Sequence, residues 1–241
     1  MSESLDFRLV KLLLLVTLAA MTQFVITPES RAQSRELRVG VASHVRTLDV
    51  QEETSNAGAQ FLPQIFDTLI ERDNYAAPLR FVPGLATSWR MVGPTTMELK
   101  LRDGVVMHDG TQMDADDVKF SIERMLDPKN PRFSATRGRF FYNLKSVEVV
   151  DRLTVRVHTM RPDPLLETLL SARNAGITSR KYVEKIGPDK AGLQPVGTGP
   201  YRVSSFRPNE TVTLVRHEKF WGERPPFDRI IYQRIPEVAA R

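Results

Sequence analysis

The stretch Pro195-Val-Gly-Thr-Gly-Pro-Tyr201 restricts the fold more than any other part of the sequence. Glycine adopts backbone angles that other residues rarely reach, so we expect Gly197 and Gly199 to supply such angles. Proline is tolerated at the first residue of a strand or on an edge strand, which suits Pro200 in front of the strand-like segment 201–206. The stretch therefore predicts a sharp turn that leads the chain into a strand.

A phosphate-binding loop is the alternative interpretation of these glycines. Such a loop needs a lysine after its last glycine and a helix behind it, so that the lysine and the backbone amides meet the phosphates. Here Pro200 follows Gly199, and a strand is expected next. A dinucleotide-binding loop also opens a helix, and its third glycine is missing. The sequence favours the turn.

Residues 1–32 have the layout of a secretory signal peptide. Arg8 and Lys11 precede an apolar run at 12–20, and small residues flank Arg31. The run is shorter than the roughly 20 residues that a membrane-spanning helix needs, and an uncleaved amphipathic anchor is the alternative. The chain has no cysteine, which excludes disulfides, thiolate metal sites and lipid attachment through cysteine. We expect an exported, soluble periplasmic protein that is not a lipoprotein.

The charge distribution argues against a nucleic-acid partner. The sequence has 34 Lys and Arg against 29 Asp and Glu, a formal net charge of +5. These residues are interleaved along the chain, whereas nucleic-acid binding calls for a basic stripe or patch. A mixed, solvated surface is the simpler expectation.

Hydrophobic periodicity predicts a chain of the α/β class with strands and helices in irregular order. The expected strands are 36–42, 96–101, 146–150, 153–159, 201–206, 211–216 and 229–235. Helices are expected at 56–70, 115–126, 164–173 and 179–186. Asp114 should cap the second helix, with Asp116 and Asp117 in its first turn, where the helix dipole favours negative charge. Pro63 lies inside the first helix, which therefore begins either at Asn56 or only at Pro63.

No residue pattern points to catalysis, a metal ion or a cofactor. None of the four histidines pairs with another at metal-ligand spacing, and no Gly-x-Ser-x-Gly occurs. His108 and Asp109 could form an acid/base pair, but adjacent side chains do not face each other. Trp89 and Trp221 are expected to anchor the core. We expect the fold to depend on Trp89 and on the glycines of the turn more than on any histidine.

Several further motifs occur in a fixed order along the chain. They are Thr47-Leu-Asp49, Gln64–Ile70, Pro83-Gly-Leu-Ala-Thr-Ser-Trp89, Leu101–Gly110 with Asp114–Val118, Pro195–Tyr201, and Phe220-Trp221. Each motif alone is weak, but together they resemble the family-5 extracellular solute-binding proteins of ABC transporters. Members of that family bind dipeptides, oligopeptides, glutathione or nickel. The resemblance covers the chain from about Leu37 to Arg241.

The resemblance implies a periplasmic-binding-protein-like type II fold. After a signal peptide at 1–32, residues 33–67 would start the first lobe and 68–190 would form a small inserted α/β subdomain. Residues 191–241 would continue the first lobe, so that the chain is truncated before the second lobe that closes over the ligand. The helix expected to start at Pro236 would also be cut within two turns.

The resemblance also implies a function without catalysis. The chain would be the substrate-binding component of an ABC importer, which captures peptides or similar small solutes and delivers them to permease subunits in the inner membrane. The loop with Thr54, Ser55 and Asn56 resembles the stretch whose backbone pairs with a peptide ligand. Phe133, as an aromatic contact, and Asn174, facing the cleft, are further candidates. Alternatives are a truncated gene product or short paralogue without ligand binding of its own, and an exported enzyme.

Overall fold

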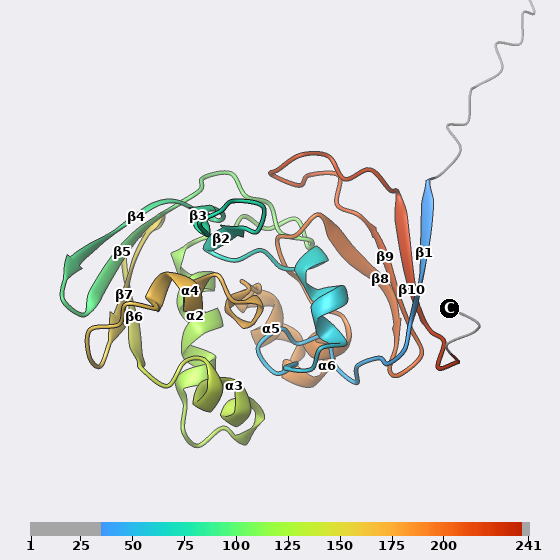
Figure 1. The fold of residues 1–241 in the computed structure, drawn as a ribbon, viewed down its shortest axis with the longest axis horizontal. Helices are drawn as coiled ribbons and strands as arrows, with labels where there is room; N and C mark the ends of the chain where they lie inside the picture. The colour runs from blue at the N-terminus through green and yellow to red at the C-terminus, as the bar shows by residue number, and fades with distance from the viewer. Residues whose placement is uncertain (1–34, 238–241) are drawn as a thin grey trace, which may run out of the picture. The chain divides into compact units, whose positions relative to one another are not determined.

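The computed structural model describes residues 35–237, whose strands form two four-stranded sheets and one two-stranded sheet (Figure 1). The expected signal peptide at 1–32 lies outside these residues, as does the chain from 238 onwards, where a helix was expected to continue. The fold class expected from the sequence, α/β with strands and helices in irregular order, is confirmed.

The first sheet joins the two ends of the described chain. Its order is β1 (Glu36–Val41), β10 (Arg229–Arg234), β9 (Thr211–Arg216) and β8 (Tyr201–Arg207). Strand β1 pairs with β10 in parallel, and the other pairs are antiparallel. The chain therefore leaves this sheet after β1 and returns to it only at β8.

The second sheet is built from the intervening segment and is antiparallel throughout. Its order is β4 (Ala86–Gly93), β5 (Thr96–Leu101), β7 (Thr154–Thr159) and β6 (Leu144–Asp151). The hairpin expected to turn at residues 151–152 is present between β6 and β7, but its two turn residues are 152 and 153, because Asp151 still pairs with Thr154. A separate hairpin is formed by β2 (Ile70–Asp73) and β3 (Arg80–Pro83).

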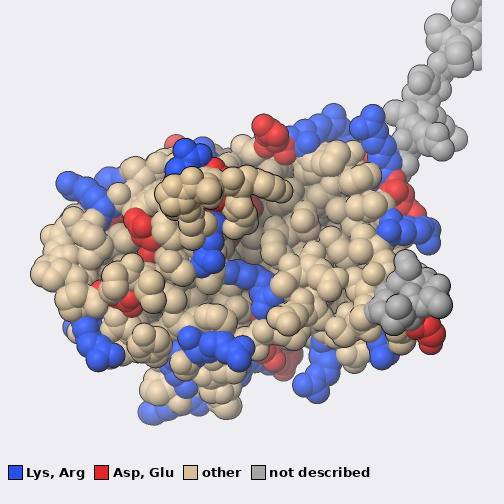
Figure 2. All heavy atoms as spheres, in the orientation of Figure 1, with Lys and Arg blue, Asp and Glu red and all other residues tan. Residues whose placement is uncertain are grey.

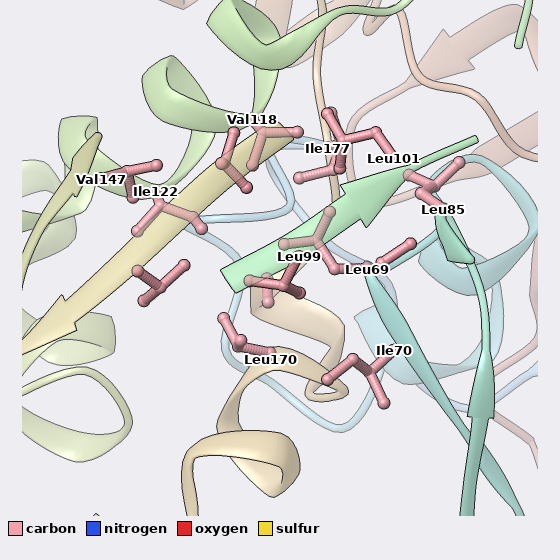
Figure 3. Packing of buried hydrophobic residues seen from close by; sticks show 14 of the residues in the cluster. Leu69, Ile70, Leu85, Leu99, Leu101, Val118, Ile122, Val147, Leu170 and Ile177 are labelled. Carbon is pink, nitrogen blue, oxygen red and sulfur yellow. The ribbon is translucent and has the colours of Figure 1, made fainter. Parts of the chain in front are cut away.

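Helix α2 (Ala115–Leu126) packs on the second sheet through an apolar face. Val118 and Ile122 are fully buried and lie beside Val147 of β6 (Figure 3). Complete burial of such a side chain contributes roughly 1.5–3 kcal/mol. The expected cap is confirmed, because the Asp114 carboxylate accepts hydrogen bonds from the backbone of Asp116 and Asp117 at 3.0 and 3.3 Å. The two residues form a capping box, because the Asp117 carboxylate in turn accepts a hydrogen bond from the Asp114 amide.

The remaining helices are short. They are η1 (Gly58–Gln60), η2 (Leu62–Gln64), η3 (Pro131–Phe133), α3 (Ser134–Arg139), α4 (Leu166–Leu170), η4 (Arg173–Ala175), α5 (Arg180–Ile186) and α6 (Pro188–Leu193). The helices expected at 164–173 and 179–186 correspond to α4 with η4 and to α5.

The expected helix at 56–70 is wrong. The segment forms only the two 3-10 turns η1 and η2, and β2 begins at Ile70. Pro63 lacks the backbone N–H that a helix interior requires. The backbone carbonyls of Ile65 and Asp67 bond to distant parts of the chain. They accept hydrogen bonds from the amides of Gly199 and Ile177, both at 3.0 Å. Tertiary hydrogen bonds replace the helical ones.

The buried apolar residues form two clusters that follow the two large sheets. The first runs from Leu69 to Val196 and surrounds α2 and the second sheet (Figure 3). The other combines residues from Val41 to Phe66 with residues from Tyr201 to Tyr232. The boundaries of the inserted subdomain at 68 and 190 stay a prediction.

Gly197 and Gly199 are needed for close packing and not for unusual backbone angles. The glycines with positive φ among the described residues are Gly104, Gly110 and Gly187, so the expected reason was wrong. A Cβ atom on Gly197 would lie 2.3 Å from the Ile65 carbonyl oxygen, and one on Gly199 would lie 2.6 Å from the Ile65 carbonyl carbon. Only a residue without a side chain allows the two backbones to cross here.

His108 holds this turn, a role that the sequence reasoning missed. Its Nδ1 accepts a hydrogen bond from the Gly197 amide at 3.2 Å, and its Nε2 lies 2.9 Å from the Gly199 carbonyl oxygen. The two contacts together require a neutral ring with the proton on Nε2. Burial lowers the pKa of His108 to about 4, which keeps the ring neutral at physiological pH.

Substituting Gly197 or Gly199 by alanine should destabilise the fold by about 1–3 kcal/mol, because a methyl group would be forced against the Ile65 carbonyl. Gly138→Ala in α3 is the matched control, since a Cβ there meets no atom within 4 Å. That control should be neutral or stabilising by about 0.5–1 kcal/mol. Urea-induced unfolding measures all three, and equal stabilities would contradict the packing argument.

Candidate functional site

A groove of about 1060 Å³ opens beside the chain that follows β1. Its lining comes from loop residues 44–47 and 52–55, Arg132 and Arg139 around α3, Asp189 and Leu193 of α6, and Asn209 in the β8–β9 turn. Acidic and basic side chains of the described residues are interspersed over the face drawn in Figure 2. The groove is mostly polar in its lining and is suited to a hydrated or charged ligand.

The structure brings only part of the expected site to this groove. Thr54 and Ser55 line it, and Asn56 follows them as an exposed residue. Phe133 and Asn174 are 2% and 3% exposed and do not line the groove. Phe133 instead contacts Arg124 of α2, and Asn174 binds backbone carbonyls of the loop at residues 49–56.

A buried ion pair fixes the start of the loop. Arg124 of α2 donates to the Asp49 carboxylate at 2.6 Å, and the two side chains are only 9% and 3% exposed. Arg124 also donates to Gln51 Oε1 at 3.2 Å. Its guanidinium lies 4.6 Å from the ring centre of Phe133 and 5.4 Å from that of Phe120. These cation–π contacts give Phe133 a structural role beneath the loop.

Side chains from η4 hold the carbonyl groups of the same loop. The Asn174 amide donates to the carbonyls of Val50 and Glu53 at 2.6 and 3.0 Å. The Arg173 guanidinium donates to the carbonyls of Ser55 and Glu53 at 3.1 and 3.2 Å. The loop that borders the groove is therefore held in one conformation by charged and amide donors.

Some backbone groups of the loop are left free to bind a ligand. The Ser55 amide donates to the Glu53 carboxylate at 2.6 Å, and the Ser55 carbonyl is taken by Arg173. In contrast, the N–H and C=O of Thr54 and the N–H of Asn56 make no hydrogen bond to any residue between 35 and 237. Thr54 and Asn56 can thus offer backbone hydrogen bonds that Ser55 cannot.

An ion-paired arginine crosses one side of the groove. Arg132 contacts Glu52 at 3.2 Å and also pairs with Asp189. Burial raises the pKa of the Glu52 carboxyl, and the neighbouring Arg132 opposes that rise. Arg132 thereby links the loop to α6.

Between residues 35 and 237, no three His, Asp or Glu side chains are grouped so that they could hold a metal ion. In the same part of the chain, each helix is too short or too polar to cross a membrane.

The comparison with known families decides the classification. The model of the bacterial extracellular solute-binding proteins, family 5 (middle part), matches residues 80–241. The chain belongs to this family. The resemblance seen in the sequence motifs is confirmed.

Individual relatives agree with this assignment. Heme-binding protein A of Haemophilus influenzae is 30% identical over 213 residues, which are 80% of this chain and 38% of that protein. The dipeptide-binding protein of Escherichia coli is 27% identical over 236 residues, 85% of this chain and 44% of the relative. The chain thus spans about two fifths of the length of these relatives.

Solved structures show the same fold. The periplasmic binding protein MoaA of A. tumefaciens R10, in complex with mannopinic acid, superposes with a TM-score of 0.77 at 30% identity, covering 86% of this chain and 42% of MoaA. The Helicobacter pylori protein DppA in complex with the peptide STSA also gives a TM-score of 0.77, at 23% identity, covering 86% of this chain and 44% of DppA. The periplasmic-binding-protein type of fold is confirmed, and the described residues correspond to part of it.

Replacing Arg124 by methionine should cost about 3–5 kcal/mol of stability, because it leaves the buried Asp49 carboxylate without its partner. Arg152→Met is the matched control, since its ion pair with Asp103 is exposed and screened by water. It should change the stability little. Chemical denaturation of both variants tests this, and similar losses would show that the Asp49–Arg124 pair has no special structural role.

Proposed function

We propose that this chain forms part of the substrate-binding component of an ABC importer, which captures a peptide or similar small solute in the periplasm and delivers it to permease subunits. The observation that carries the proposal is the groove of about 1060 Å³ beside a loop whose conformation is fixed from below. Membership of family 5 supports it. The relatives are named as binding proteins for different ligands, which supports binding in place of catalysis.

Thr54 and Asn56 are the residues that we assign to ligand pairing through the backbone. The free N–H and C=O of Thr54 and the free N–H of Asn56 suit an extended peptide, and such pairing does not depend on the ligand's side chains. Ser55 contributes through its exposed side chain. Because the loop is already ordered, binding requires little further loss of conformational entropy.

Phe133 and Asn174 act indirectly in this proposal. Phe133 packs on the Arg124 guanidinium, and Asn174 holds the carbonyls of Val50 and Glu53. Both keep the loop in its binding conformation, and neither needs to contact the ligand.

The purified chain should bind trialanine with a dissociation constant in the millimolar range. Ligand pockets usually bury 70–90% or more of a ligand's surface, whereas this groove is open on one side. Losing about 4 of the 8 kcal/mol of a micromolar complex leaves millimolar binding. An NMR titration should shift the amide signals of Thr54 and Asn56 first. Absence of shifts there, or micromolar affinity, would contradict the proposal.

Two variants separate backbone from side-chain recognition in the same titration. Thr54→Val keeps the backbone groups and should bind within about twofold of the parent. Asn174→Ala releases the carbonyls of the loop and should bind more weakly. If Thr54→Val abolishes binding while Asn174→Ala does not, the pairing scheme is wrong.

A further inference from the structure

The arginines and carboxylates around the groove are unequally paired. The groove is lined by three arginines and three carboxylates, namely Arg46, Arg132, Arg139, Glu52, Glu53 and Asp189. If each carboxylate were paired with one arginine, the groove would carry no preference for a charged ligand. The contacts show a different distribution.

All three carboxylates already have partners. Glu52 and Asp189 both pair with Arg132. The Glu53 carboxylate accepts a hydrogen bond from the Ser55 amide, and the Arg173 guanidinium donates to the backbone carbonyl of Glu53. All three carboxylates of the groove therefore already interact with groups of the protein.

Two arginines have no such partner. Arg46 and Arg139 are exposed, and neither forms an ion pair or a side-chain hydrogen bond with any residue between 35 and 237. The Arg139 guanidinium lies 5.9 Å from the ring centre of Phe140, which is too far to engage its N–H donors. Both guanidinium groups remain available to a ligand in the groove.

We propose that the groove selects ligands with an anionic group, a carboxylate or another oxyanion, which Arg46 and Arg139 bind. A guanidinium offers five N–H donors in a planar arrangement that matches such oxygens. When a ligand fills the groove, water is displaced from both arginines, and an unpaired charge that loses its water is costly. A ligand that supplies a negative charge removes that cost. The inference rests on the proposed function and adds the charge of the ligand to it.

The test compares trialanine with a free carboxyl terminus and trialanine with an amidated one, with inorganic sulfate as an anion that is not a peptide. The side-chain Nε–Hε NMR signals of Arg46 and Arg139 report on the site directly. Free trialanine and sulfate should both shift these signals, and the amidated peptide should bind about tenfold more weakly than the free one. Arg46→Gln and Arg139→Gln should each remove most of that difference.

Arg161→Gln is the control, because Arg161 is exposed and does not line the groove; it should behave like the parent. Equal affinity for the two peptides, with no sulfate effect on the arginine signals, would overturn the anion site and leave the proposed peptide binding intact. Sulfate binding without either peptide would support the anion site and overturn the proposed peptide ligand. No response to any of the three would overturn both.

Discussion

The crossing of residues 195–200 over residues 64–67 is the contact on which the rest of the structure depends. At this point the backbones touch, because Gly197 and Gly199 have no side chains and the Gly199 amide donates to the Ile65 carbonyl at 3.0 Å. Thr198 accepts a hydrogen bond from the Asp67 amide at 3.4 Å. The crossing lies where the chain passes from one apolar cluster to the other, so it joins the two into one unit.

The same crossing positions the groove. The loop at 47–56 continues through η1 and η2 into residues 64–67, and its own backbone also packs closely against α6. The Leu48 amide donates to the Gly192 carbonyl at 2.7 Å, and a Cβ on Gly192 would lie 2.7 Å from Thr47 Oγ1. With Arg124 and Asn174 below it, the loop has little freedom to move. The loop that borders the groove is therefore ordered by the scaffold around it.

Elements that depend only on neighbouring residues could be predicted from the sequence. The cap at Asp114 and, to within one residue, the hairpin between β6 and β7 were predicted because capping and turn chemistry depend on a few neighbouring residues. The false helix at 56–70 has the opposite origin. Its apolar spacing is helical, but the carbonyls of Ile65 and Asp67 bond to residues more than a hundred positions away. No local pattern contains that information.

Part of the groove's lining was expected from the sequence, and part was not. The motif resemblance directed attention to Thr54 and Ser55, which do line the groove. Arg124 and His108 were missed because their importance comes from distant partners, the Asp49 carboxylate and the backbone of Gly197. A charged residue beside the apolar stripe of a helix is usually solvated, so spacing alone gave no reason to single out Arg124.

Native-state hydrogen exchange tests most directly the claim that the crossing joins the two clusters. The amide of Gly199 should be as strongly protected as those of Leu99 in the second sheet and Leu214 in the first, because all three would exchange only when the whole unit unfolds. The account is contradicted if Leu214 and Gly199 exchange through an opening that leaves Leu99 protected, since the two clusters would then be separable.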